Sequence, residues 1–348
     1  MDIFTNTAET RAAVLAALHD VPDTSTDAAR PQTLLARCPV AAQTPLVASP
    51  ALAAAAGVAQ VNIKDERGRM GLGSFKALGA AYVIASDAEK GVAQGRTYVT
   101  ASAGNHGLSV AAGAQAFGAN AVVFLADTVP ETFADRLRAI GAQVERHGAI
   151  YEDSMAGAMQ AADDNGWTLL SDSSWPGYFD RPHLLMEGYL ALMAETVNQI
   201  DQAPTHIFLQ AGVGGLAAAS AAYARKAWGD APRIIVVEPD VAPALHASII
   251  AGSAQVTTGP SSDMGRLDCK EPSLIALKSL ARDATDFMLI SEAEGAGGAI
   301  AAQAAGLTST PSGAAGLAGL LAAQAGSANL DLDETSRVLV ILSEEASD

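Results

Sequence analysis

The chain has 348 residues, which is enough for one large domain or two ordinary domains with a substantial core. Hydrophobic residues make up 49% of it and charged residues 17%, a composition typical of a compact soluble protein rather than a disordered one. The formal net charge of −17 argues against binding to nucleic acid or to an anionic membrane, because both need clustered lysine and arginine.

Cysteine content and hydropathy further limit the class of protein. The two cysteines, Cys38 and Cys269, suggest neither a disulfide framework nor a multi-cysteine metal site, and we expect no metal. The first ten residues lack the basic and apolar regions of a secretory signal, and the apolar run 51–61 is too short to span a bilayer. We therefore expect a cytoplasmic protein that binds neither nucleic acid nor membrane.

Short β-branched runs alternate along the chain with longer alanine-rich stretches of helical pattern. In chain order, strands are predicted at 61–64, 97–100, 121–125, 168–170, 206–210, 233–237 and 338–342. Helices are predicted at 74–87, 108–117, 131–140, 184–200 and 216–227. This alternation predicts an α/β fold with parallel sheets covered by helices on both faces. Ligands in such folds bind beyond the carboxyl ends of strands, so we looked for chemistry in the strand-to-helix turns.

The first such turn leads to Lys76. This lysine follows a glycine-rich turn and Ser74, a helix-capping residue type, at the start of a predicted helix. Lys64 and Lys90 have no comparable setting and serve as ordinary lysines for comparison. By itself, Lys76 also fits an ordinary helix lysine.

The second turn follows the predicted strand at 97–100 and contains Ser102, Ala103, Gly104, Asn105 and His106. Hydroxyl, amide and backbone N–H donors at a helix N-terminus suit an anion such as a carboxylate. For His106 taken singly, a structural role in the turn fits better than acid–base chemistry.

The third turn contains Gly212, Val213, Gly214, Gly215 and Leu216. Glycines allow close approach of the backbone to a phosphate, and the helix N-terminus adds partial positive charge. The dinucleotide pattern G-x-G-x-x-G is not met, because alanine occupies its last position, and no P-loop motif occurs.

The fourth turn begins at Ser343, directly after the last predicted strand. Its hydroxyl fits a strand terminator or a hydrogen-bond partner for the ring nitrogen of a heterocycle. Together, a lysine nucleophile, an anion-binding turn, a phosphate-binding turn and a ring-nitrogen partner make up a site for pyridoxal phosphate and an amino-acid carboxylate.

With these motifs, the sequence from residue 44 to residue 343 resembles the fold-type II pyridoxal-phosphate enzymes, the tryptophan-synthase-β-like family. The resemblance implies two open, twisted, mostly parallel sheets flanked by helices, with the site at the domain interface. It implies a large cofactor-binding domain (1–80 plus 190–348), a small domain (81–189), and a homodimer. Its site residues map onto Lys76 as the Schiff-base lysine, Ser102 to His106 as the substrate-carboxylate loop with Asn105 near the cofactor's 3′-oxygen, Gly212 to Leu216 as the phosphate loop, and Ser343 at the pyridine nitrogen.

Within this family the sequence looks most similar to the diaminopropionate ammonia-lyases, through stretches 64–66 with 69–72, 165–167 with 172–178, and 271–273 with 311–316. The run Asp172-x-x-Trp-x-Gly-Tyr is the most specific, and the resemblance makes Asp172 one of two active-site carboxylates. The second carboxylate position of that subfamily is occupied here by Ala103. Residues 102–106, and Ser74, read instead like the serine and threonine dehydratases.

These features predict an enzyme, a pyridoxal-phosphate-dependent ammonia-lyase. It would perform α,β-elimination on a small 3-substituted 2-amino acid, with Lys76 or Asp172 removing the α-proton. A hydroxyl at Ser343 need not keep the pyridine nitrogen protonated, which favours loss of a β-substituent over transamination. Three alternatives stay open: a serine, threonine or 3-hydroxyaspartate-type dehydratase, a β-replacement enzyme of the cysteine-synthase type, and a non-catalytic amino-acid-binding relative. The sequence leaves the β-substituent and the L or D form of the substrate undetermined.

Overall fold

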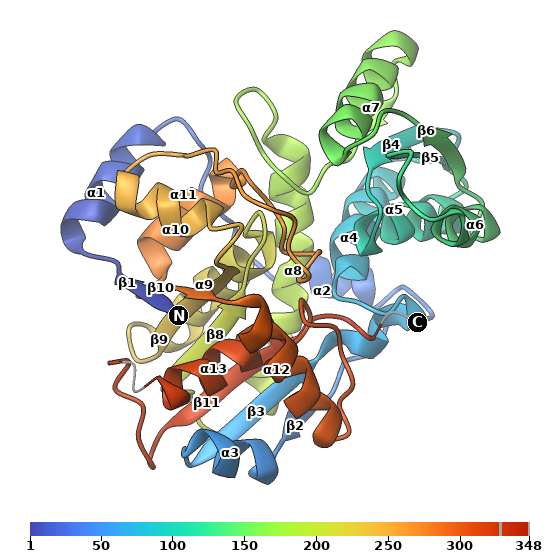
Figure 1. The fold of residues 1–348 in the computed structure, drawn as a ribbon. Coiled ribbons are helices and arrows are strands. Elements are labelled where there is room, and N and C mark those ends of the chain that lie inside the picture. Colours follow the sequence, from blue (N-terminus) through green and yellow to red (C-terminus); the bar gives the residue numbers. More distant parts are fainter. Residues whose placement is uncertain (327–328, 347–348) are drawn as a thin grey trace.

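In the computed structural model, which describes residues 1–326 and 329–346, the strands of these residues form two sheets (Figure 1). The larger has the strand order β1-β10-β9-β8-β11-β3-β2, and the smaller has the order β6-β5-β4-β7. The strands are β1 (Asp2–Thr5), β2 (Leu46–Ala48), β3 (Gln60–Asp65), β4 (Thr97–Ala101), β5 (Asn120–Leu125), β6 (Gln143–Arg146), β7 (Thr168–Leu169), β8 (His206–Gln210), β9 (Arg233–Pro239), β10 (Asp286–Ile290) and β11 (Arg337–Leu342).

Helices connect most of these strands. They are α1 (Ala8–Ala17), α2 (Ala29–Leu35), α3 (Pro50–Ala56), the 3-10 segment η1 (Glu66–Gly71), α4 (Lys76–Glu89), α5 (Asn105–Ala116), α6 (Glu131–Ala139), α7 (Tyr151–Asn165), α8 (Asp180–Gln199), α9 (Gly215–Trp228), α10 (Ala244–Ala251), α11 (Leu274–Asp283), α12 (Glu292–Ala304) and α13 (Ala315–Ala325). None of the helices described here is long and apolar enough to cross a membrane.

The predicted α/β fold with two mostly parallel sheets is confirmed. Each predicted strand and helix is present, with its ends shifted by a few residues. The pairs within the sheets are parallel except at the edges of the larger one, where β1 and β2 pair antiparallel with β10 and β3. The sequence patterns missed β1, β2, β6 and β10. β1, β2 and β6 are only three or four residues long, so pairing rather than an alternating pattern defines them.

The helices cover both faces of each sheet. On the larger sheet, α13 packs across β8 to β11 on one face, and α9 packs on β8 from the other. On the smaller sheet, α5 and α7 pack against β4 and β5. Helix α4 packs against both α5 and α8 and so links the two layers (Figure 1). The smaller sheet lies within 97–169, while the domain boundaries at 80 and 190 stay a prediction.

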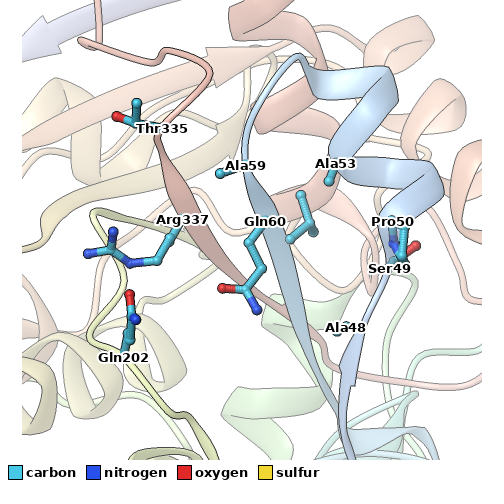
Figure 2. A pocket seen from close by; sticks show the side chains of 10 residues that line it. Ala48, Ser49, Pro50, Ala53, Ala59, Gln60, Gln202, Thr335 and Arg337 are labelled. Atoms are coloured by element: carbon cyan, nitrogen blue, oxygen red, sulfur yellow. The ribbon is translucent and has the colours of Figure 1, made fainter.

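A hollow of about 480 Å³ lies at the N-terminal ends of β3 and β11 (Figure 2). Its lining includes Gln60, Gln202 and Arg337, and it contains no carboxylate, histidine or cysteine. Acid–base chemistry needs such groups, and they occur at the opposite, carboxyl edge of these strands, where ligands bind in folds of this kind.

At that edge, the parallel pairing of β3 with β11 brings two distant segments together. Asp65 is in register with Leu342, so both strands end at the same level. Beyond them the pairing continues, because Phe75 N–H donates to the carbonyl of Ser343 (3.1 Å) and Glu345 N–H donates to that of Gly73 (2.9 Å). The start of α4 is therefore held beside the end of β11.

Gly73 is required at this junction. Its φ of +76° lies in the region that favours glycine, and a Cβ placed there would meet Glu345 Oε1 at 2.3 Å. The tight turn thus allows the backbone of Glu345 to reach the chain just before Lys76.

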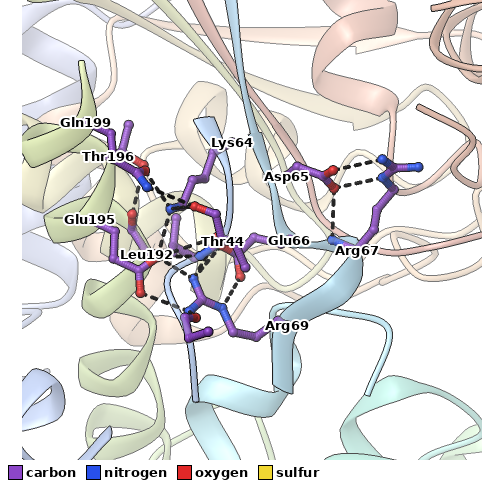
Figure 3. Close-up of polar contacts among 11 residues, drawn as sticks. Thr44, Lys64, Asp65, Glu66, Arg67, Arg69, Leu192, Glu195, Thr196 and Gln199 are labelled. Carbon is purple, nitrogen blue, oxygen red and sulfur yellow. Dashed lines mark hydrogen bonds and ion pairs between the residues drawn. The ribbon is translucent and has the colours of Figure 1, made fainter. Parts of the chain in front are cut away.

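A buried network of charges holds the segment that precedes this turn (Figure 3). Lys64, at 0% side-chain exposure, donates to Glu195 Oε2 at 2.7 Å. Arg69, at 1% exposure, donates to both Glu66 and Glu195 at 2.7 Å. Thr44 completes the set by donating to Glu66 at 2.6 Å. The comparison of Lys64 with an ordinary lysine was therefore wrong, since its ammonium is fully buried.

The network is balanced, with two cations facing two carboxylates. Burial acts to raise the pKa of Glu195, but the hydrogen bonds from Arg69 and Lys64 outweigh it and lower that pKa. Each charge has partners in place of water, which is the condition under which buried ions are tolerated. The network joins η1 to α8 and so fixes the direction from which the chain approaches Lys76.

We expect Glu195→Gln to lower the free energy of unfolding by about 3–5 kcal/mol, because it leaves two buried cations with one carboxylate. Urea unfolding would measure the loss. The folded-state pKa of Glu195 is lowered, so its stabilisation is present above its ordinary pKa of 4.5 and is lost as the pH falls through the lowered value. Variant and wild type should therefore converge in acid.

The matched control is Arg138→Gln, which breaks an exposed ion pair with Glu131 on α6 and should leave the free energy of unfolding nearly unchanged. Equal stability of the Glu195 variant and wild type at neutral pH would contradict the role given to the network.

Candidate active site

Turns from both sheets converge on one region at the carboxyl ends of their strands. The larger sheet contributes the turns after β3, β8 and β11, and the smaller contributes those after β4 and β7. Every residue predicted for the site lies on one of these turns. The contacts below connect them.

Lys76 and Asp172 are in direct contact. Lys76 is the first residue of α4, and Asp172 lies shortly after β7. The ammonium Nζ donates to Asp172 Oδ2 at 2.5 Å, and the two side chains are 22% and 21% exposed. A lysine from the larger layer thus meets a carboxylate from the smaller one.

Both groups stay ionised at neutral pH. Burial acts to lower the pKa of Lys76, but the adjacent carboxylate of Asp172 outweighs it and raises that pKa. Burial likewise acts to raise the pKa of Asp172, and the charge of Lys76 outweighs it and holds the pKa well below its usual range. At neutral pH the pair is therefore an ammonium and a carboxylate in direct contact.

Tyr189 of α8 connects this pair with the glycine-rich turn. Lys76 Nζ lies 5.9 Å from the centroid of the Tyr189 ring and 5.2 Å from that of Phe75, within the range of cation–π contacts. Cε2 of the Tyr189 ring lies 3.6 Å from the position of a Cβ on Gly215. One aromatic side chain thus spans from the lysine to the start of α9.

The turn before α9 offers an anion-binding cradle. Within the described residues, no backbone carbonyl accepts from the N–H groups of Gly212, Gly214, Gly215 and Leu216. Gly214 caps the helix with φ of +99°, and a Cβ on Gly212 would lie 2.9 Å from Cys269 Sγ. Free N–H groups at a helix N-terminus, on a turn where Gly212 and Gly214 have no room for a side chain, suit a phosphate.

The turn after β4 is held by local contacts. Ser102 Oγ accepts from Gly104 N–H at 3.3 Å. The ring nitrogen Nε2 of His106 lies 2.7 Å from the carbonyl of Leu170, which ties this turn to the one that carries Asp172. Burial lowers the pKa of His106, so the ring is neutral at pH 7. The geometry supports the structural role expected for this histidine.

Glu344 joins the turn after β4 to the end of β11. Asn105 Nδ2 donates to Glu344 Oε2 at 2.5 Å, and Thr310 Oγ1 donates to Oε1 at 2.5 Å. Arg266 Nε stands 3.8 Å from the same carboxylate. The neighbouring Ser343 hydroxyl has no side-chain partner among the described residues, which leaves it available to a ligand.

A family model described as "Pyridoxal-phosphate dependent enzyme" matches residues 38–344. The chain belongs to this family. The cradle of free N–H groups, the adjacent lysine and the unpartnered Ser343 hydroxyl fit the phosphate, the carbonyl carbon and the ring nitrogen of that cofactor. The prediction of pyridoxal phosphate is therefore confirmed.

Known relatives narrow the chemistry within the family. Diaminopropionate ammonia-lyase of Escherichia coli K12 is 34% identical over 266 residues, which cover 70% of this chain and 67% of that enzyme. L-serine dehydratase/L-threonine deaminase of mouse is 32% identical over 212 residues, covering 60% of this chain and 61% of the relative. The prediction of a pyridoxal-phosphate-dependent carbon–nitrogen lyase related to these enzymes is confirmed.

The fold agrees with solved structures. Diaminopropionate ammonia-lyase from Escherichia coli in complex with D-serine has a TM-score of 0.88 and 28% identity, covering 100% of this chain and 94% of the other. The same enzyme with an aminoacrylate–pyridoxal-phosphate azomethine intermediate gives a TM-score of 0.87 at 29% identity. The prediction of the fold-type II architecture is thus confirmed.

The sequence patterns missed four side chains of the site, Glu344, Tyr189, Arg266 and Cys269. Glu344 directly follows Ser343 at a strand end, so the same positional argument would have found it. Tyr189 lies inside a long apolar helix and carries no local signal. Arg266 and Cys269 lie in the loop 260–272, whose path only the tertiary structure gives.

We expect Gly214→Ala to raise the Kd for pyridoxal phosphate by at least about fivefold. An alanine at this positive φ costs about 1–3 kcal/mol, so the variant's turn relaxes in the apoprotein and must regain the strained conformation to bind the phosphate. An added Cβ would also meet Ala276 Cβ at 3.0 Å. Titration of the apoprotein, followed by the visible absorbance of the bound cofactor, measures this.

Gly229→Ala is the matched control. This glycine ends the same helix, also has positive φ (+59°), and has open space around its Cβ position. Its substitution should leave the Kd for the cofactor unchanged. Equal affinities of the Gly214 variant and wild type would remove the turn from the phosphate site.

Proposed function

We propose that this protein eliminates the β-substituent of a small 3-substituted 2-amino acid and releases a 2-keto acid and ammonia. The observation that carries the proposal is the contact of Lys76 with Asp172, at 2.5 Å, beside the phosphate cradle. A lysine that holds the cofactor and a carboxylate that can govern its proton are the two groups that elimination needs. Similarity to ammonia-lyases and dehydratases supports the same reaction class.

In the elimination, the α C–H bond and the bond from Cβ to its substituent break. The C–H electron pair becomes the Cα=Cβ double bond, and the substituent leaves with the electron pair of its own bond. Water then replaces the α-nitrogen, which gives the 2-keto acid and ammonia. When bound, pyridoxal phosphate supplies the electron sink that acidifies the α C–H bond.

Lys76 is the base that takes the α-proton in our proposal, acting as the neutral amine that it becomes when the substrate amine displaces it from the cofactor. Asp172 has a lowered pKa and is a weak base, whereas the same contact stabilises the ammonium that Lys76 becomes on accepting the proton. Asp172 also keeps that ammonium directed at one position, from which Lys76 can pass the proton to the leaving group. His106 is neutral and bound to a backbone carbonyl, so it takes no part in the proton transfer.

The remaining contacts to cofactor and substrate follow from the geometry of the turns. The N–H groups of residues 212–216 would hold the phosphate, and Ser343 would face the ring nitrogen. Residues 102–106 would receive the substrate carboxylate at the N-terminus of α5. Asn105 would reach the cofactor from the same turn while its amide is oriented by Glu344. We also propose that the enzyme works as a homodimer in the cytoplasm, as the family resemblance implies.

A dehydratase acting on hydroxy amino acids is the second candidate. The observation that favours it is Ala103, which places a methyl group rather than a carboxylate in the turn after β4. A β-ammonium group has one fewer counter-charge there, while a β-hydroxyl group needs none. Ammonia and keto-acid release from 2,3-diaminopropionate and from serine, each in L and D form, would separate the two candidates.

We expect Lys76→Ala to abolish keto-acid formation, because the cofactor loses its attachment and the α-proton its base. The assay is steady-state release of keto acid with serine and 2,3-diaminopropionate. Lys90→Ala is the control, since this exposed lysine follows the last residue of the same helix. Undiminished turnover by the Lys76 variant would exclude the proposed role.

We expect Asp172→Asn to reduce kcat by about 100-fold or more, in line with the loss of a positioned proton-transfer group. Removal of the carboxylate also removes what raises the pKa of Lys76, so the acidic limb of the pH–kcat profile should move to lower pH. Asp163→Asn, on the exposed face of α7, should change neither. An unaltered profile and kcat would leave Asp172 outside the chemistry.

A further inference from the structure

Arg266 lies against the turn that we propose for the substrate carboxylate. Its Nη1 donates to the carbonyl of Ala103 at 3.4 Å. The guanidinium carbon and two of its nitrogens lie 3.3 Å from the position of a Cβ on Gly104. A side chain at Gly104 would make the guanidinium shift by a few tenths of an ångström, so the glycine lets Arg266 lie directly against this turn.

The guanidinium has donors to spare. Among the described residues, its side chain makes one hydrogen bond, to the carbonyl of Ala103, and its ion pair with Glu344 is at 3.8 Å. Glu344 is itself committed to Asn105 and Thr310 at 2.5 Å each. The Arg266 side chain is 43% exposed, so its remaining N–H groups can be reached by a ligand.

The other cation of the same loop is not available in this way. Lys270 Nζ contacts Asp268 at 2.7 Å and donates to the carbonyls of Val241 and Pro260 at 2.9 Å each. Arg266 is held by its backbone instead, because its N–H donates to Ser312 Oγ at 3.1 Å. The main chain at Arg266 is fixed while the tip of its side chain remains free to bind.

The positive charge of Arg266 is opposite in sign to the net charge of the protein. The chain carries 38 acidic residues against 21 Lys and Arg, and a net charge of −17 repels an anionic substrate. The turn itself, Ser102 to His106, contains no carboxylate, and the neighbouring Glu344 carboxylate already accepts from Asn105 and Thr310. An exposed guanidinium at this turn gives an anion a local positive partner.

We propose that Arg266 is a specificity-determining residue that binds a second carboxylate, carried on Cβ of the substrate. The inference rests on the proposed elimination and names its substrate class, a 3-substituted aspartate such as 3-hydroxyaspartate. Only three bonds separate the two carboxyl carbons of such a substrate. Ser102 and Gly104 already use their N–H groups, so the α-carboxylate would bind those of residues 103, 105 and 106, which donate to no carbonyl of the described residues. The β-carboxylate would then lie on the side of this turn against which the Arg266 guanidinium packs. The planar fork of arginine matches a carboxylate with two parallel hydrogen bonds.

The reaction on this substrate is balanced. The α C–H and β C–O bonds break, the C–H electron pair forms the double bond, and hydroxide leaves with a proton as water. A second water replaces the α-nitrogen. The products of 3-hydroxyaspartate are thus oxaloacetate and ammonia, with no oxidant or reductant needed.

A matched pair of substrates tests the proposal, since 3-hydroxyaspartate and serine share the leaving group and differ by the β-carboxylate. We expect the wild-type holoenzyme to have the higher kcat/KM on 3-hydroxyaspartate. In Arg266→Gln, the ratio of kcat/KM for 3-hydroxyaspartate to that for serine should fall roughly 10- to 100-fold, the effect of losing a charged hydrogen-bonded pair. Arg266→Lys keeps the positive charge but loses the planar guanidinium, so its substrate ratio should lie between those of wild type and Arg266→Gln.

Arg138→Gln is the matched control. Its guanidinium is also ion-paired to a carboxylate and is 45% exposed, but it lies on α6, away from the site. Its substitution should leave the substrate ratio unchanged. Equal cofactor absorbance and thermal unfolding midpoints would establish that the Arg266 variants are folded and loaded.

A binding measurement that needs no turnover tests the role of Arg266 independently of the elimination reaction. Aspartate and alanine both lack a β leaving group, and their Kd values for the holoenzyme are measured from the visible absorbance of the cofactor. We expect tighter binding of aspartate than of alanine in wild type, by about tenfold or more, and loss of that preference in Arg266→Gln.

An unchanged substrate ratio, together with equal losses on every substrate, would overturn the proposal for Arg266 and leave the elimination reaction standing. If wild type turns over no amino acid, the proposed function fails, and only the Kd values for aspartate and alanine then test whether Arg266 binds a β-carboxylate. Equal Kd values for aspartate and alanine in wild type would overturn the proposal for Arg266.

Discussion

The parallel pairing of β3 with β11 is the constraint from which the active site follows. Two strands that are distant in sequence end in register, and the backbone hydrogen bonds between 73–75 and 343–345 continue that pairing past the sheet. Lys76 can then begin a helix only beside Ser343. Because β8 is the other neighbour of β11, the glycine-rich turn before α9 leaves the same edge one strand away. The order of the strands in the larger sheet therefore determines which turns lie side by side at the cofactor site.

Electrostatic balance allows this edge to contain so many ionised groups. Beneath the turn to Lys76, two cations and two carboxylates neutralise one another with almost no exposure to water. At the site the same pairing recurs with less buried groups, because Lys76 and Asp172 are 22% and 21% exposed and Arg266, at 43%, stands near the buried Glu344. The buried set gives a rigid base, because breaking it would leave charges without partners. The partly exposed groups can be reached by a ligand.

In the proposed mechanism each layer supplies half of the chemistry. The larger sheet carries Lys76, the turn proposed for the phosphate and Ser343, while the smaller carries Asp172 and the turn proposed for the substrate carboxylate. Contacts across the layers include Lys76 with Asp172 and Asn105 with Glu344. A relative movement of the layers would change these distances together. The packing of α4 against α5 and α8 holds the two layers in this arrangement.

The sequence alone determined the α/β fold, seven of the strands and five of the helices, the cofactor and the turns that carry Lys76, Asn105, Gly212–Gly215, Asp172 and Ser343. Glycine spacing and β-branched periodicity are properties of neighbouring residues, so they can be recognised from the sequence alone. The tertiary structure decided what these turns contact. That Lys64 is a fully buried ion, that Tyr189 bridges the lysine and the phosphate turn, and that Arg266 faces Gly104 are results of long-range packing. No pattern in the neighbouring residues encodes a charge's partner on a distant segment, because burial and pairing arise only when the strands are brought into order.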